Sequence, residues 1–160
     1  MLIVATLAGL AAVLGIFENM LPVLTAIPGG KLGVANTVTV VALWLFGPVS
    51  AIAVSLVRVT VSCMLYGGMN AFMYSFAGAV FSTGAMICAR KLLKESITPV
   101  GISVLGAACH NTAQVAVAWM ILRSVSLVWY LAWLLIISLV SGTGCGWIAG
   151  ECIYRIKTKD

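Results

Sequence analysis

The chain has 160 residues, of which 62% are hydrophobic and 8% are charged, and its net charge is +5. Water-soluble domains are typically about 45–50% apolar and about 25% charged, so this composition excludes a soluble enzyme and a soluble nucleic-acid-binding protein. It predicts an all-α integral membrane protein, a polytopic helical bundle that forms one domain over residues 1–160.

Six apolar segments, separated at glycine, proline and charged residues, predict six transmembrane helices. The first, residues 2–18, lacks the basic start and cleavage site of a signal peptide, so we expect it to be retained. The second, residues 34–47, is short for a hydrocarbon core about 30 Å thick, and a tilted or partly re-entrant helix would accommodate it. The other segments are residues 48–66, 70–90, 99–122 and 127–154.

Basic residues follow the fourth and the sixth segment. They are Arg90, Lys91, Lys94, Arg155, Lys157 and Lys159. The positive-inside rule predicts that both places are cytoplasmic. Because the number of segments is even, we expect the N-terminus to be cytoplasmic as well. The loop of residues 19–33 and the turns at 67–69 and 123–126 are then external, and Arg123 departs from the rule.

Arg58 is predicted to lie near the middle of the bilayer. It stands about ten residues from the inner end of the third segment, which corresponds to a depth of about 15 Å. Ser55 and Ser62 lie on the same helical face, at i−3 and i+4. Because a buried ionisable group costs several kcal/mol unless it finds a partner or water, this polar stripe is a candidate binding site.

Other polar side chains are predicted at a similar depth or nearer the outer side. His110 and Asn111 lie just past the middle of the fifth segment, and Gln114 lies one turn further out. Glu18 ends the first segment at the outer side, where Asn36 begins the second. We therefore expect the polar groups to converge in the outer half of the bundle and the inner half to be apolar.

The stretch PGGKLG, residues 28–33, places Lys31 among glycines in the outer loop. Such a loop could close as a lid over a ligand that carries a carboxylate, a phosphate or another electron-rich group. The residues predicted to bind this ligand are Glu18, Lys31, Asn36, Arg58, His110, Asn111 and Gln114. We predict no catalytic residue, no metal and no cofactor.

Three structural interpretations compete with this site. Arg58 could pair with Glu18 only to neutralise a buried charge. The amide and imidazole groups of the fifth segment could be interhelical hydrogen bonds, which average only about 0.6 kcal/mol in a membrane protein. The stretch PGGKLG could be an ordinary turn.

Three stretches resemble one family of small bacterial membrane proteins. They are LGIFENMLPVLTAIPGGKLGVANTVTVVALWLFGP (14–48), RVTVSCMLYGG (58–68) and GAACHNTAQVAVAW (106–119). The family is labelled Gx transporter or heptaprenyl diphosphate synthase component I. It is similar to the substrate-binding S components of energy-coupling factor (ECF) transporters.

The resemblance implies six helices, cytoplasmic termini and an outward-opening pocket in a bacterial cell membrane. It also implies a transmembrane partner and two ATPase subunits, because the chain has no Walker A motif. In S components, small residues at four-residue spacing on the first helix dock on the partner, and Ala8 and Ala12 match that spacing. The leading prediction is thus an importer subunit for a small organic molecule, either anionic or related to isoprenoid and quinone precursors.

The second family label implies the alternative function, a non-catalytic membrane component associated with heptaprenyl or polyprenyl diphosphate synthesis. Ionisation of an allylic diphosphate normally uses magnesium held by clustered aspartates. This chain has one aspartate, Asp160, so we do not expect it to be a prenyltransferase by itself. A purely structural helix bundle is the third alternative.

Overall fold

The structure is a computed structural model that describes residues 1–20, 33–66, 68–124 and 126–158. These residues form six α-helices and one short 3₁₀ helix, with no strand among them, which confirms the predicted all-α bundle. The elements are α1 (Leu2–Met20), α2 (Val34–Phe46), α3 (Pro48–Tyr66), α4 (Gly68–Leu93), η2 (Lys94–Ser96), α5 (Pro99–Leu122) and α6 (Ser126–Lys157).

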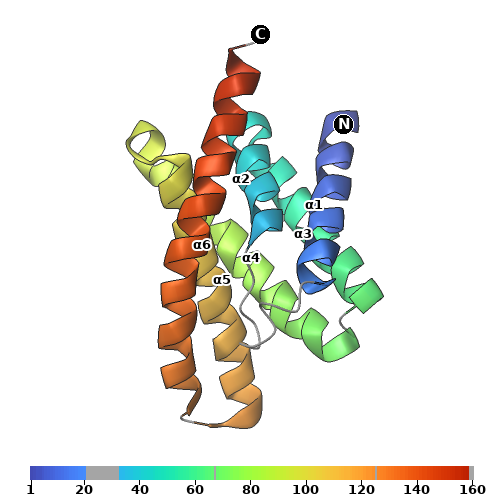
Figure 1. Ribbon diagram of the computed structural model, residues 1–160, viewed down its shortest axis with the longest axis vertical. Coiled ribbons are helices and arrows are strands. Elements are labelled where there is room, and N and C mark those ends of the chain that lie inside the picture. Colours follow the sequence, from blue (N-terminus) through green and yellow to red (C-terminus); the bar gives the residue numbers. More distant parts are fainter. Residues whose placement is uncertain (21–32, 67, 125, 159–160) are drawn as a thin grey trace.

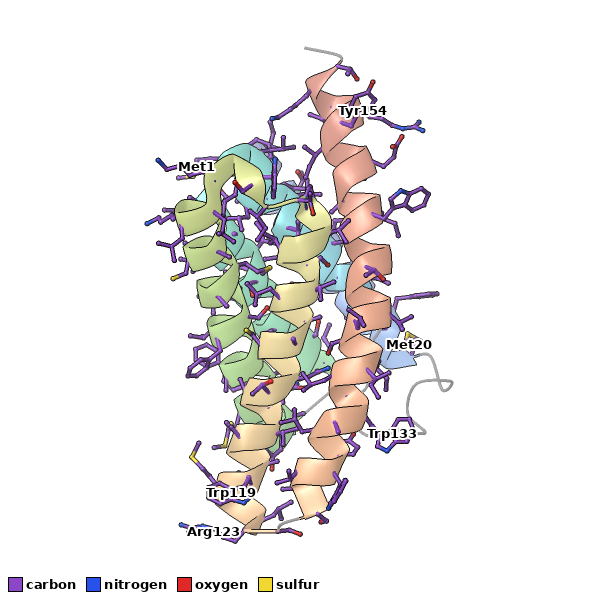
Figure 2. All side chains as sticks on the ribbon, turned by 90° about the vertical axis from the view of Figure 1, so that its left-hand side faces the viewer. Met1, Met20, Trp119, Arg123, Trp133 and Tyr154 are labelled. Carbon is purple, nitrogen blue, oxygen red and sulfur yellow. The ribbon has the colours of Figure 1, made fainter. Side chains whose placement is uncertain are left out.

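Both termini lie at the same end of the bundle, and the turn between α5 and α6 lies at the opposite end (Figure 1). This arrangement confirms an even number of passes along the bundle axis. Figure 2 shows Trp119, Arg123 and Trp133 toward the end opposite the termini, where the sequence predicts the outer surface. The cytoplasmic placement of the termini stays a prediction.

Four helices are long and apolar enough to cross a membrane, which makes the chain a multi-pass membrane protein. The apolar parts of α1 and α2 are shorter. With 13 residues, α2 is about 20 Å long, which is less than the roughly 30 Å hydrocarbon core. It ends at Gly47, whose φ of 84° few other residues adopt, and Pro48 starts α3 directly afterwards.

An apolar core closes the end of the bundle near the termini. It joins α2, α3, α4, α5 and α6, and includes Leu43 and Ile153 near the C-terminal ends of α2 and α6. At the same end the Arg90 guanidinium lies 3.8 Å from the ring centroid of Trp44, so a cation–π contact ties α4 to α2. This half of the bundle also buries the hydroxyl groups of Ser55, Thr83 and Ser103, so it is not purely apolar as the sequence predicts.

Glycines bring α6 unusually close to α5. A Cβ atom on Gly146 would lie 2.5 Å from Val100 Cα, and one on Gly142 would lie 2.7 Å from Val104 Cα. Lipid tails are as apolar as the helices, so association in a membrane depends on such close van der Waals packing. The small glycine side chains therefore allow α5 and α6 to pack backbone against backbone.

We predict that Gly146→Ala lowers the free energy of unfolding by about 1–3 kcal/mol, because the added methyl group would push α6 away from the α5 backbone. Gly144→Ala is the matched control, since a Cβ there meets nothing within 4 Å. Titration with SDS in mixed micelles measures both values. Equal stabilities of the two variants would contradict close packing at Gly146.

Candidate functional site

Two cavities lined by described residues share Glu18, Arg58 and His110. The larger has about 480 Å³ of empty space, which includes the part that is open to the outside. Its lining residues are Glu18, Gly33, Asn36, Arg58, Ser103, Ala107, His110, Asn111, Ser141, Gly142 and Cys145. The smaller encloses about 350 Å³ on the same basis and is lined by Gly15, Glu18, Arg58, Val59, Ser62, Cys63, Ser75 and His110.

Arg58 lies in the middle of α3, where Ser55 and Ser62 share its face as the sequence predicts. Among the described residues, its Nε–H is buried and has no hydrogen-bond acceptor. The Glu18 carboxylate acts on the guanidinium electrostatically. The cation is thus partly balanced within the protein, and it still has a donor group that a bound molecule could use.

Glu18 has a structural role that the sequence did not reveal. Its carboxylate is 9% exposed and accepts a hydrogen bond from the backbone N–H of Val34, the first residue of α2. The first N–H groups of a helix have no acceptor within the helix, and the helix dipole favours a negative charge there. Glu18 therefore fixes the end of α1 to the start of α2.

The His110 side chain can lie beside both cavities because α4 has a glycine, Gly78, opposite it. A Cβ atom on Gly78 would lie 2.7–2.9 Å from three atoms of the imidazole ring. Any larger residue at this position would displace the ring. Gly78 is therefore a positioning residue for His110.

Asn111 acts as a bridge between helices. Its Nδ2 donates to Ser138 Oγ at 2.7 Å and to the Leu134 carbonyl oxygen at 3.3 Å, both on α6. This geometry supports the interhelical alternative for Asn111, although the residue also lines the larger cavity. Asn36 lines that cavity too, whereas Gln114 lines neither cavity.

Two predicted groups remain, the lid and the docking residues. Lys31 and the rest of the proposed lid up to residue 32 lie outside the described residues. Ala8 and Ala12 are buried, and Ala8 packs in an apolar cluster with Val38 and Val54. Their role in docking a partner stays a prediction.

α6 contributes residues to the larger cavity that are not predicted from the sequence. Ser141, Gly142 and Cys145 line it from this helix, and Thr37 of α2 donates a 3.5 Å hydrogen bond to the Cys145 carbonyl oxygen. Ser103 of α5 is not predicted either; it is 1% exposed, and its hydroxyl has no partner among the described residues. The sequence feature that indicates the contribution of α6 is the cluster of small residues at 141–146, because small side chains leave room beside the helix.

Six helices, four of them long and apolar enough to cross a membrane, define the class of the molecule, a polytopic α-helical membrane protein. The family model for heptaprenyl diphosphate synthase component I matches residues 7–152. The chain belongs to this family, as the sequence resemblance implied. No curated protein and no solved structure matches it.

We predict that Asn111→Ala lowers the free energy of unfolding by about 1 kcal/mol, since it removes both hydrogen bonds to α6. Thr112→Ala is the matched control, because Thr112 is exposed and its hydroxyl bonds only to Ala108 of its own helix. The control should change stability by less than about 0.5 kcal/mol in the same SDS titration. An unchanged stability of Asn111→Ala would contradict the bridging role.

Proposed function

We propose that the protein is a non-catalytic membrane component that binds a small organic molecule in the larger cavity and serves polyprenyl diphosphate synthesis with a partner. The description of the family supports this assignment, because a component I is one part of a synthase that has more than one component. The partner would supply the catalytic residues. We place the complex in the bacterial cell membrane.

The observation that carries the binding role is the set of unsatisfied polar groups at the cavity wall. Arg58 Nε and Ser103 Oγ are buried, belong to residues that line the larger cavity, and have no hydrogen-bond partner among the described residues. Burying such groups without partners costs about 1–3 kcal/mol each. A ligand with acceptor oxygens would recover this energy, which fits an anionic molecule or a precursor of isoprenoids or quinones.

The absence of catalysis rests on the distribution of carboxylates in the sequence. Prenyl transfer requires magnesium to hold the leaving diphosphate, and clustered aspartates normally bind that magnesium. The chain has the single aspartate Asp160 at its C-terminal end. The Glu18 carboxylate accepts a hydrogen bond from the Val34 N–H at the start of α2. Glu151 forms a 2.6 Å salt bridge with Arg155 at the exposed end of α6.

The second candidate function is an S-component-like subunit of an ECF importer that acts with a transmembrane subunit and two ATPases. The position of both termini at one end of the bundle favours it (Figure 1). The docking residues on α1 would be Ala8 and Ala12, whose four-residue spacing matches that of S components. Purification from the native membrane separates the two functions: a soluble aspartate-rich synthase supports the first, and ATPase subunits support the second.

We predict that native mass spectrometry of the protein extracted from its own membrane shows a bound small organic molecule. Arg58→Ala should lower its affinity at least tenfold, because a hydrogen bond to a charged group contributes about 1.5–3 kcal/mol. Gly78→Ala should also weaken binding by displacing His110. Gly84→Ala, where a Cβ meets nothing within 4 Å, is the control on the same helix. If all variants retain the bound molecule equally, the larger cavity is not its binding site.

A further inference from the structure

The smaller cavity has a composition that the proposed function does not explain. It lies among α1, α3, α4 and α5, beyond the wall that Arg58 and His110 share with the larger cavity. Hydroxyl and thiol groups line it, from Ser62, Cys63 and Ser75. The described residues that line it include no amide side chain, whereas those of the larger cavity include Asn36 and Asn111.

Ser62 lines this cavity and carries an unused hydrogen-bond donor. The residue is 7% exposed, and its buried hydroxyl has no partner among the described residues. Ser62 follows Arg58 by one turn of α3, so the hydroxyl and the Arg58 guanidinium project from the same face of the helix. A cation and a hydroxyl placed in this way are complementary to an oxygen-bearing anion.

α1 can pass close to the two donors because it carries a glycine opposite them. A Cβ atom on Gly15 would lie 2.7 Å from Ser62 Oγ and 3.5 Å from Arg58 Cγ. An alanine here would force the Ser62 hydroxyl to move. The position of the Ser62 hydroxyl therefore depends on Gly15.

Glu18 also lines this cavity, and its negative charge opposes a bound anion. The hydrogen bond from the Val34 N–H holds its carboxylate at the start of α2, where the helix dipole stabilises it. The smaller cavity contains no residue of α2. The N-terminus of α2 therefore partly compensates the negative charge of Glu18. α2 lines the larger cavity through Asn36.

We propose that the smaller cavity is an oxyanion subsite, in which Arg58 and Ser62 donate hydrogen bonds to a carboxylate or phosphate group. The group would belong either to the organic ligand or to a free inorganic anion. If the anionic group belongs to the organic ligand, this subsite rests on the proposed function. In that case the carboxylate or phosphate is the part of the ligand that the subsite recognises.

The test measures binding of inorganic phosphate and of acetate to the full-length protein in detergent, by calorimetry and thermal shift at constant ionic strength in chloride. We expect saturable binding of at least one anion, with affinity three- to tenfold lower in Ser62→Ala. Gly15→Ala should show a loss of similar size. Gly9→Ala, on the same helix with nothing within 4 Å of its Cβ, should bind like the wild type.

A second measurement distinguishes the two sources of the anion. If the group belongs to the organic ligand, free anions bind weakly or not at all, and Ser62→Ala and Gly15→Ala reduce occupancy by the co-purified molecule in native mass spectrometry. If neither anion binds and both variants retain that molecule as the wild type does, the subsite is overturned while the larger cavity keeps its function. If an anion binds with the expected losses and no organic molecule co-purifies, the subsite stands and the proposed function fails.

Discussion

The hydrogen bond from the Val34 N–H to the Glu18 carboxylate is the interaction on which the arrangement of the site depends. Since α2 is shorter than the hydrocarbon core, at least one of its ends lies within the thickness of that core, and the first N–H groups of a helix have no acceptor within the helix. Non-helical backbone at such a depth is tolerated where protein covers it or where it borders a water-filled cavity. Glu18 meets this requirement from α1, and its charge then lies at the wall of the larger cavity.

This constraint explains why Arg58 can occupy the interior of the bundle. A cation at the centre of a bilayer needs compensation, and the anchored carboxylate provides a nearby opposite charge. The guanidinium stands between two cavities and keeps an unsatisfied Nε–H. Glu18 can therefore balance the charge of Arg58 while the Arg58 Nε–H stays without a protein acceptor among the described residues. From the sequence alone, charge balance and ligand binding are competing interpretations of Arg58.

The helices could be predicted closely from the sequence because glycine, proline and charge interrupt the apolar stretches. Gly47 and Pro48, for example, mark the sharp turn between α2 and α3. Depth counting also placed Arg58, His110 and Asn111 at one level, and the structure brings them to the larger cavity. Their roles in binding remain predictions.

The rest of the site depends on features that a linear sequence does not specify. α6 is apolar on nearly all sides, so the pattern does not fix which face carries Ser141 and Cys145 to the cavity. The spacing of Ala8 and Ala12 indicates close helix packing, but it does not identify the neighbouring helix. The positions of Gly15 and Gly78 opposite polar side chains are likewise visible only once the helices are packed.

The hairpin of α5 and α6 reaches further from the termini than α1 does. Figure 2 shows Met20, at the end of α1, well short of Trp119 and Arg123 at the tip of this hairpin. With 32 residues, α6 is about 48 Å long, and α2 is less than half that length. The surrounding lipid thus meets a stepped profile, and the leaflet beside the short helices has to thin or the whole protein has to lean. A change in bilayer thickness therefore affects the side of the protein where α1 and α2 line the larger cavity.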